Sequence, residues 1–516
     1  MKKLLSVILA LLMLSFVFVA CDEGISDATE SGDTEVQTIE DSETESDTEL
    51  PSVDTEPPSV DTEGEETDKK DDSGEVEIEM PKIDIMNSTA SQKYFVGTTN
   101  KDAVSYKANE EIIFTVKLQA DGELASCPYF KYTLSADDGT SQAAKYVDGS
   151  TGTLTVKTKI SKAGFVYLKV EACNKNRHPI SGVASFNGGA GADISSITKT
   201  KSEPADFDEF WNTQLAWLDE VEPELLSCEK YTFAGAVAGY DYYKVKIKFH
   251  ENAVWGKYVS AYLTVPQNAL PGSLDLHVEY NGAGVSDLNK YHSSNAALLN
   301  VAAHSMELGQ NSSYYQGLAN GWLKDYGFNP EYNSSRDTIY FKEMILRDIQ
   351  AVRFMRKYFA ADGPSFTFTD GTKGSFAGLG NGKVNLAGGS QGGFQCMAVA
   401  ALDGGIDYQI AYCPWLSDIG GYGLNGTQTS DYMPEYTAAL EYFDSINFAK
   451  RVKCRTMIKT VGLGDTTTPP KGITALYNVL ANNGNNVKVD ITYWQNRTHS
   501  YTAPSGTYDS ITVKNY

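Results

Sequence analysis

Apolar and polar residues alternate along four short segments in the first half of the chain. The segments are Glu111–Gln119, Tyr129–Ser135, Thr153–Ile160 and Gly164–Cys173. Alternation with a period of two is typical of strands that bury one face, and Asp-Gly and Gly-rich turns separate the segments. Short strands at this spacing predict a small all-β sandwich of the immunoglobulin type over residues 81–198.

Residues 199–516 show a different pattern, in which short apolar runs alternate with helical repeats. The runs are Asp275–Tyr280, Val384–Ala387, Ile406–Cys413 and Thr456–Gly462. Residues 341–358 instead repeat apolar side chains at helical spacing. Strands that alternate with helices predict a mostly parallel sheet with helices on both faces.

The first residues have the pattern of a secretory signal. Lys2 and Lys3 precede an apolar run from Leu4 to Ala20, and Cys21 follows. The letters FVAC at residues 18–21 resemble a bacterial lipoprotein box, although Leu is usual where Phe18 stands. We therefore expect a signal peptide over 1–20, a lipidated Cys21, and a secreted protein anchored at the surface of the bacterial cell envelope. The alternative is an ordinary cleaved signal with an incidental cysteine.

The net charge of −24 is concentrated in one segment. Residues 22–80 hold 24 acidic residues and two lysines, which leaves residues 81–516 with a net charge of −4. A segment so acidic and so poor in aromatics cannot bury enough apolar surface to fold, and the repeated letters PSVDTE at 51–56 and 58–63 fit a linker. Residues 21–80 are thus predicted to be a disordered tether. No basic stripe indicates nucleic acid, and no second run is long enough to span a membrane.

Cysteine spacing indicates no zinc site, because none of the cysteines forms a Cys-x-x-Cys pair. Cys127 precedes one predicted strand and Cys173 ends another. If these strands are antiparallel neighbours, the two ends meet, and a disulfide is plausible in an oxidising compartment. Two unpaired buried thiols are the alternative.

Residues 388–392 (GGSQG) form a Gly-x-Ser-x-Gly motif with Ser390 at its centre. The motif follows the apolar run Val384–Ala387 and precedes a helix-like run, Phe394–Leu402. This strand–turn–helix context is the one that a nucleophile elbow requires. Ser390 is therefore the candidate nucleophile.

A serine hydroxyl needs a base and the base needs an acid, and in this arrangement both follow the serine in the chain. The six histidines are His178, His250, His277, His292, His304 and His499. Only His499 follows Ser390, in a polar loop after the predicted last strand. Asp465 directly follows a strand and precedes a turn, so it is preferred as the acid over its three competitors, Asp418, Asp431 and Asp444.

Backbone N–H groups are expected to stabilise the oxyanion that develops on the substrate. One donor is predicted to be Gln391, directly after the nucleophile. The other should come from the Gly-rich loop after an early strand, where Ala283 is the candidate. Removal of one such donor typically costs about 3 kcal/mol of transition-state stabilisation.

Residues 203–500 resemble the acetyl xylan esterase and cephalosporin-C deacetylase group, carbohydrate esterase family 7. The resemblance rests on the following segments: PADFDEFW at 204–211, 340–356, GGSQGG at 388–393, FDSINFAKRVKC at 443–454 and GLGDTTTPP at 462–470. It implies an α/β-hydrolase fold with Ser390 as nucleophile, Gln391 as oxyanion donor, Asp465 as acid and His499 as base. It also implies hydrolysis of small acyl esters, chiefly acetyl groups on xylan-derived sugars, without cofactor or metal.

One departure changes the expected substrate range. The family's early loop commonly reads His-Gly-Tyr, whereas this chain has Asn281, Gly282 and Ala283. The backbone donor is kept but an aromatic wall of the acyl pocket is lost, so a somewhat larger acyl group would fit. Two other functions stay open: a serine peptidase or other acyl hydrolase of the same fold, and a non-catalytic glycan-binding lipoprotein. The oligomeric state is also open.

Overall fold

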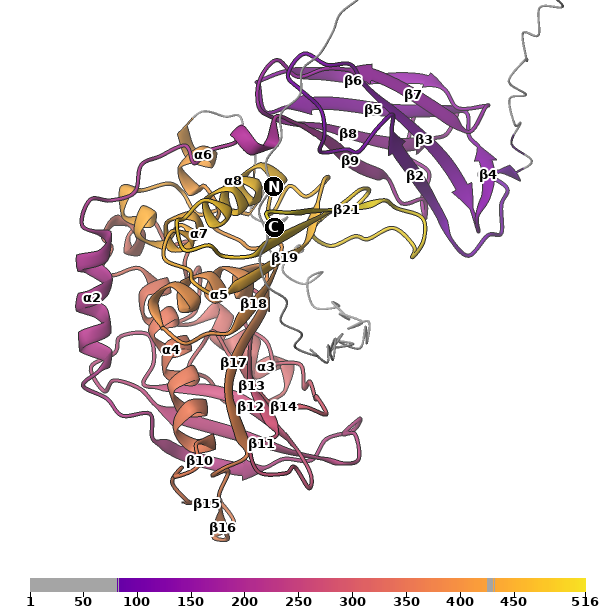
Figure 1. Ribbon diagram of the computed structural model, residues 1–516. Helices are drawn as coiled ribbons and strands as arrows, with labels where there is room; N and C mark the ends of the chain where they lie inside the picture. Colours follow the sequence, from indigo (N-terminus) through magenta and orange to yellow (C-terminus); the bar gives the residue numbers. More distant parts are fainter. Residues whose placement is uncertain (1–80, 82, 425–429, 431) are drawn as a thin grey trace, which may run out of the picture. The chain divides into compact units, whose positions relative to one another are not determined.

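The computed structural model describes residues 81, 83–424, 430 and 432–516 (Figure 1). The predicted signal peptide, Cys21 and the acidic tether lie outside the described residues, as does Asp431. Contacts divide the chain into Met1–Glu79 and Met80–Tyr516, so every described residue belongs to the second unit. None of the helices in the described part has the length and apolar character that a membrane crossing needs.

The first described elements form two sheets that enclose one apolar core. One sheet consists of β1 (Ile83–Asp84), β4 (Glu123–Ser126), β3 (Ile112–Ala120) and β2 (Lys93–Thr99), with β7 (Thr153–Thr158) paired to β3. The other consists of β6 (Ser141–Asp148), β5 (Tyr129–Ala136), β8 (Gly164–Cys173) and β9 (Phe186–Ala192). Side chains such as Phe114 of β3 and Phe130 of β5 are fully buried between them. The two-sheet arrangement agrees with the predicted sandwich, and the immunoglobulin type stays a prediction.

The two cysteines of this sandwich are close but not bonded. β5 and β8 pair antiparallel with Tyr129 opposite Cys173, so the strand ends meet as expected. Both thiols are nevertheless free and buried, and each lies near a carbonyl of its own segment: Cys127 near Tyr129 and Cys173 near Glu171. The disulfide is therefore not formed in this structure.

The rest of the chain is built on a ten-stranded sheet (Figure 1). Its strands, in spatial order, are β10 (Leu225–Lys230), β11 (Tyr240–Lys248), β12 (Tyr258–Pro266), β14 (Ala296–Val301), β13 (Leu274–Tyr280), β17 (Gly380–Gly389), β18 (Tyr408–Tyr412), β19 (Arg455–Gly462), β20 (Val489–Trp494) and β21 (Ser510–Lys514). A separate hairpin joins β15 (Phe366–Thr367) to β16 (Lys373–Gly374).

The sheet is mixed, and its central strands are parallel as the sequence predicts. The six strands from β14 to β20 are parallel, whereas β10, β11, β12 and β21 add antiparallel pairs at the two ends. Antiparallel neighbours need only a short connection, whereas a parallel pair needs a long crossover. The segments that join β10, β11 and β12 have no helix, so these strands can pair only as a meander.

Helices cover both faces of the sheet. They are α2 (Phe207–Leu218), α3 (Ser312–Asn320), α4 (Tyr340–Phe359), α5 (Gln391–Leu402), α6 (Ile419–Leu424), α7 (Ser445–Ala449) and α8 (Pro470–Ala481). In β12, Ala261 and Leu263 join the main core with α4 and α5. The intervening Tyr262 points to the other face, where it packs with Tyr315 of α3.

The parallel strands bring several loops to one edge of the sheet, because their carboxyl ends all point the same way. Asn281 follows β13, Ser390 follows β17, Cys413 follows β18, and Asp465 lies shortly after β19. The loop that carries His499 follows β20. The fold therefore gathers at one edge most of the residues that the sequence marked for chemistry.

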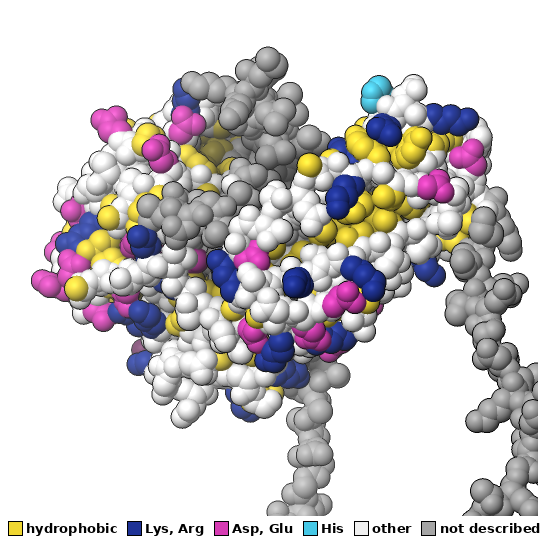
Figure 2. All heavy atoms as spheres, turned by 90° about the horizontal axis from the view of Figure 1, so that it is seen from above, with side chains coloured by type: hydrophobic (Ala, Val, Ile, Leu, Met, Phe, Trp, Pro, Cys, Tyr) yellow, Lys and Arg dark blue, Asp and Glu magenta, His cyan; other side chains and the backbone are white. Residues whose placement is uncertain are grey.

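Charges of both signs are interspersed on the surface. On the face shown in Figure 2, Lys and Arg side chains lie among Asp and Glu side chains and do not gather by sign. This distribution fits the near-neutral net charge of residues 81–516.

Candidate active site

Ser390 occupies a strained turn between β17 and α5. Its backbone has φ of 55° and ψ of −114°, a conformation that costs a non-glycine residue about 1–3 kcal/mol. The turn is held by two hydrogen bonds: the Ser390 N–H donates to Tyr412 O at 2.9 Å, and the Trp415 N–H donates to Ser390 O at 3.0 Å. The hydroxyl is thereby presented at the tip of the strand.

The glycines around Ser390 are required by close backbone contacts. A Cβ on Gly392 would lie 2.1 Å from the carbonyl oxygen of Tyr280, and one on Gly388 would lie 2.6 Å from the backbone of Gly392. Such distances are far inside van der Waals contact. The Gly-x-Ser-x-Gly pattern thus marks a place where strand, turn and helix touch without side chains between them.

The three residues predicted for catalysis lie within hydrogen-bonding distance of one another. His499 Nε2 is 3.1 Å from Ser390 Oγ, and His499 Nδ1 is 3.0 Å from Asp465 Oδ2. Both distances suit a proton relay in which the imidazole lies between the hydroxyl and the carboxylate. The side chain of His499 is 13% exposed and that of Asp465 is 1% exposed, so bulk water has little access to the pair.

Two threonines hold the carboxylate of Asp465 in place. It accepts hydrogen bonds from the N–H of Thr467 at 2.8 Å, the N–H of Thr468 at 2.9 Å and the hydroxyl of Thr468 at 2.7 Å. The Thr468 hydroxyl is also 3.3 Å from His499 Nδ1. The segment GLGDTTTPP at 462–470 contains these threonines, whose role was not predicted; their position directly after the acid was the available signal.

The competing aspartates serve other groups. Asp418 accepts the N–H of Thr200 at 2.7 Å, and Asp444 accepts the N–H groups of Ile419 at 2.8 Å and Ile446 at 2.9 Å. Asp444 thereby caps the short helix α7. Of the candidate acids that the structure describes, Asp465 is the one that contacts His499.

Burial and the mutual attraction of the pair oppose each other in setting the two pKa values. Burial alone would raise the pKa of Asp465, but His499 and Thr468 hold it below its ordinary value. Burial alone would lower the pKa of His499, but the Asp465 carboxylate, and after it Cys413, raise it well above the ordinary value. The pair therefore favours a charged imidazole beside a charged carboxylate.

Cys413 lies beside the pair and was not singled out as a site residue. Ligand atoms of Cys413, Asp465 and His499 lie within 4.8 Å of one another, a combination of residue types that could hold a metal ion. Both nitrogens of His499 already face partners, Ser390 on one side and Asp465 on the other. The arrangement as it stands suits proton transfer.

The loop with the predicted second oxyanion donor lies against the elbow. A Cβ on Gly282 would be 3.6 Å from Gly389 O, which places Ala283 close to the nucleophile's turn. The next residue, Gly284, is held on both sides: its N–H donates to the Tyr326 hydroxyl at 2.7 Å, and its carbonyl lies 3.1 Å from His304 Nε2. Burial lowers the pKa of His304 to about 3, so the ring is neutral and its Nε2 proton donates to that carbonyl.

The same tyrosine connects this loop to the other predicted donor. The Tyr326 hydroxyl donates to the side-chain Oε1 of Gln391 at 3.3 Å. Gln391 is fully buried at the start of α5. The backbone segments of Ala283 and Gln391 are thus joined through one hydroxyl, a link that the sequence pattern did not reveal because Tyr326 lies in a separate loop.

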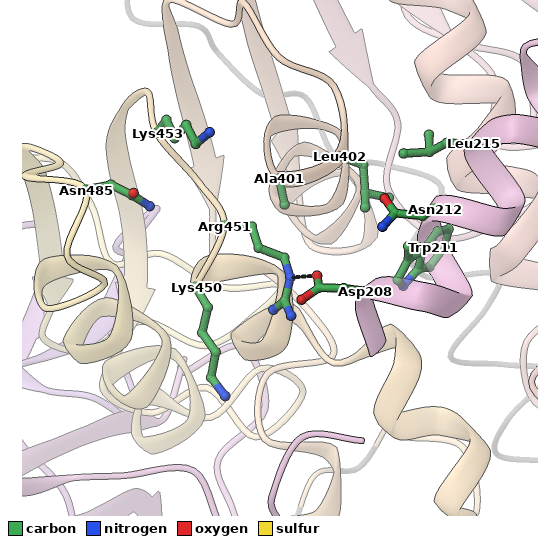
Figure 3. Close-up of a pocket in the computed structure, with 10 residues that line it drawn as sticks. All are labelled: Asp208, Trp211, Asn212, Leu215, Ala401, Leu402, Lys450, Arg451, Lys453 and Asn485. Atoms are coloured by element: carbon green, nitrogen blue, oxygen red, sulfur yellow. Dashed lines mark hydrogen bonds and ion pairs between the residues drawn. The ribbon is translucent and has the colours of Figure 1, made fainter. Parts of the chain in front are cut away.

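A surface cavity of about 330 Å³ lies away from these residues (Figure 3). Its lining comes from α2, the end of α5 and the segment after α7, and includes an ion pair between Arg451 and Asp208 at 2.5 Å. None of Ser390, Asp465 and His499 lines it. We assign it no part in the chemistry.

Comparison with known proteins finds one family model and several similar proteins. The family model described as acetyl xylan esterase (AXE1) matches residues 192–421 and 426–505. The acetyl esterase Axe7A of Xylanibacter ruminicola is 24% identical over 341 residues, which cover 62% of this chain and 68% of that protein. An acetyl xylan esterase structure from a Paenibacillus species is 20% identical, with a TM-score of 0.45, over 60% of this chain and 94% of the other. Acetyl xylan esterase 1 from a Thermoanaerobacterium species is 20% identical, with a TM-score of 0.42, over 61% and 94%.

The close contact at Gly392 leads to a stability prediction. We expect Gly392→Ala to lower the free energy of unfolding by roughly 1–3 kcal/mol, because the new methyl group must displace the Tyr280 carbonyl. Gly404→Ala is the matched control, since a Cβ there has nothing within 4 Å. Urea unfolding of both variants is the measurement, and equal stability of the two would show that the elbow has room for a side chain.

Proposed function

The chain belongs to the acetyl xylan esterase family, and on this basis we propose that it is a serine esterase that removes acetyl or other small acyl groups from xylan-derived carbohydrates through an acyl-enzyme. The observation that carries the proposal is the hydrogen-bonded series from Asp465 through His499 to Ser390. A hydroxyl becomes a nucleophile when a base accepts its proton, and this series supplies the base and its partner.

The proposed reaction has two halves. Ser390 Oγ attacks the ester carbonyl while its proton passes to His499 Nε2, and that proton then goes to the leaving sugar oxygen as the carbon–oxygen bond breaks. In the second half, water attacks the acyl-enzyme and gives a proton to His499 Nε2, which passes it to Ser390 Oγ as the bond to the acyl carbon breaks and the acid leaves. Asp465 stabilises the imidazolium in both halves and keeps Nδ1 protonated.

Two backbone N–H groups are proposed to stabilise the oxyanion. Gln391 contributes the first, from the beginning of α5, where unpaired N–H groups also carry the positive end of the helix dipole. Ala283 contributes the second, from the loop held by Tyr326 and His304 through Gly284. Support for this assignment is that Gln391 directly follows Ser390 and that Gly282, which precedes Ala283, lies against Gly389.

The acyl group is proposed to extend beyond acetyl. Ala283 has a methyl group where the resembled family commonly has an aromatic ring, so the wall beside the oxyanion loop is lower. Rates on nitrophenyl acetate, propionate and butyrate test this directly. A steep fall from acetate to propionate would show that another side chain closes the pocket.

The assembled triad favours catalysis over a purely glycan-binding role, and the family membership favours an esterase over a peptidase. The wider fold assignments belong to the same proposal: an α/β hydrolase for residues 199–516 and an immunoglobulin-like sandwich for 81–198. They are supported by the sheet order and by the strand–turn–helix geometry at Ser390.

The substrate proposal is tested by acetate release from acetylated xylan oligosaccharides. We expect release by the wild type and a loss of roughly 10⁶-fold in kcat for Ser390→Ala, because removal of the nucleophile abolishes the acyl-enzyme. Ser313→Ala, at an exposed serine on α3, is the control and should keep full activity. Hydrolysis of nitrophenyl esters without acetate release from xylan would leave the triad intact and overturn the substrate assignment.

The raised pKa of His499 leads to a prediction on pH dependence. The base works only when neutral, so kcat/KM should fall as pH drops through a midpoint above the ordinary histidine value. In Asp465→Asn the carboxylate that raises this pKa is gone, so the midpoint should move to lower pH, and kcat should fall by about 10⁴. Asp418→Asn should keep the wild-type midpoint. A midpoint that stays in place in Asp465→Asn would assign the titration to another group.

Export and lipid anchoring are proposed from the residues before 22 alone. We expect Cys21→Ala to move the protein from the membrane fraction to the soluble fraction of the producing bacterium, because the acyl chains attach to that cysteine. Cell fractionation with immunoblotting is the measurement, and Cys127→Ala is the control. An unchanged membrane fraction in Cys21→Ala would refute the lipid anchor.

A further inference from the structure

The loop that carries His499 begins with two buried amide side chains that bond to the sandwich. Gln495 and Asn496 follow β20 and are 3% and 0% exposed. Gln495 Oε1 accepts the Gly189 N–H and Gln495 Nε2 donates to the Gly189 carbonyl, both at 2.9 Å. This two-point pairing is the pattern that a neighbouring strand would offer.

Asn496 adds two more bonds of the same kind. Its Oδ1 accepts the N–H of Asn187 at 3.0 Å, and its Nδ2 donates to the carbonyl of Phe95 in β2 at 2.7 Å. Asn187 and Gly189 belong to β9, which is the edge strand of its sheet. An edge strand presents unpaired backbone groups, and these two side chains satisfy them.

The turn that carries Asp465 also lies against β9. A Cβ on Gly464 would be 2.3 Å from the Asn187 carbonyl oxygen, and a Cβ on Gly189 would be 2.7 Å from the Leu463 carbonyl oxygen. Leu463 and Gly464 directly precede the acid. Backbone therefore packs on backbone at this point, with no room for a side chain on either partner.

The contact continues into the hydrophobic core. Phe165 of β8 is fully buried, and its ring centroid is 6.1 Å from that of Tyr493 in β20. Phe165 belongs to the main core of the ten-stranded sheet and not to the core of its own sandwich. The interface thus has an apolar centre beside the polar bonds of Gln495 and Asn496.

We propose that the sandwich is a positioning element of the active site, and that Gln495 and Asn496 are the positioning residues through which β9 orients His499. The inference rests on the proposed esterase function, because it concerns the same triad. A displacement of about 1 Å in a catalytic group can cost about 10²-fold in rate, so a loop held from outside its own sheet is sensitive to that support.

The test compares two variants that disturb the interface, in the full chain. Gln495→Met removes both bonds to Gly189 at nearly constant volume, and Gly189→Ala pushes a methyl group against the Leu463 carbonyl across the interface and the Val166 carbonyl within the sandwich. We expect each to lower kcat on nitrophenyl acetate by about tenfold or more while KM changes little. We expect no second substitution outside the interface to restore kcat in Gln495→Met.

Two matched controls separate positioning from ordinary destabilisation. Gly149→Ala creates the same 2.7 Å clash with a carbonyl oxygen, that of Cys127, but inside the sandwich. Asn478→Leu removes amide bonds from α8 to Ile194 O at 2.8 Å and Ile197 O at 2.9 Å, which touch neither catalytic loop. Both should keep kcat. An equal loss of kcat in all four variants, or none in Gln495→Met, would overturn the proposal.

Amide hydrogen exchange supplies a readout that does not depend on activity. Exchange of residues 497–501 should accelerate in Gln495→Met and stay at the wild-type rate in Asn478→Leu, both measured well below the melting temperature. If the wild type hydrolyses no ester, the proposed function fails. Faster exchange in Gln495→Met, but not in Asn478→Leu, would still show that β9 holds this loop. Unchanged exchange in Gln495→Met refutes it.

Discussion

Direct contact of backbone with backbone, at the edge where the parallel strands end, is the constraint on which the active site depends. Gly392 meets the carbonyl of Tyr280, and Gly462 meets that of Arg497, at distances that exclude any side chain. These contacts bring the ends of β13, β17, β19 and β20 close enough for Ser390, Asp465 and His499 to bond in series. The strained backbone of Ser390 persists because neighbouring segments hold it on both sides.

Burial gives the triad its electrostatic character. A carboxylate that is 1% exposed is costly unless hydrogen bonds replace its water, and Asp465 receives them from Thr467, Thr468 and His499. The same exclusion of water strengthens the attraction between the carboxylate and the imidazole. Because the donors are already in place before any substrate binds, little reorganisation is needed when charge develops on His499.

Sequence reasoning succeeded where function is encoded in a short stretch and failed where it depends on distant contacts. The turn around Ser390 is local, and His499 could be chosen because no other histidine follows it. Tyr326 was missed because a tyrosine has no distinctive spacing and its partner Gln391 lies 65 residues away, whereas Thr468 was given no role although it lies three residues after the acid that it holds. The antiparallel strands at the two ends of the sheet were not assigned for a related reason, since an apolar run predicts a strand but not the direction of its neighbour.

The interface with β9 shows why a second domain has a place next to the chemistry. The stretch between β20 and β21 carries His499 without a helix or strand of its own, and Asn496 adopts a left-handed conformation with φ of 52°. Ordering such a stretch costs about 1–2 kcal/mol of backbone entropy per residue, so it needs partners outside itself. The ten-stranded sheet supplies some of them, since the Gly464 N–H donates to the Arg497 carbonyl at 3.0 Å, but β20 itself is already paired on both sides. The edge of β9 supplies others, through the buried amides of Gln495 and Asn496. These contacts therefore give the sandwich a role in holding the loop of the histidine, as proposed above.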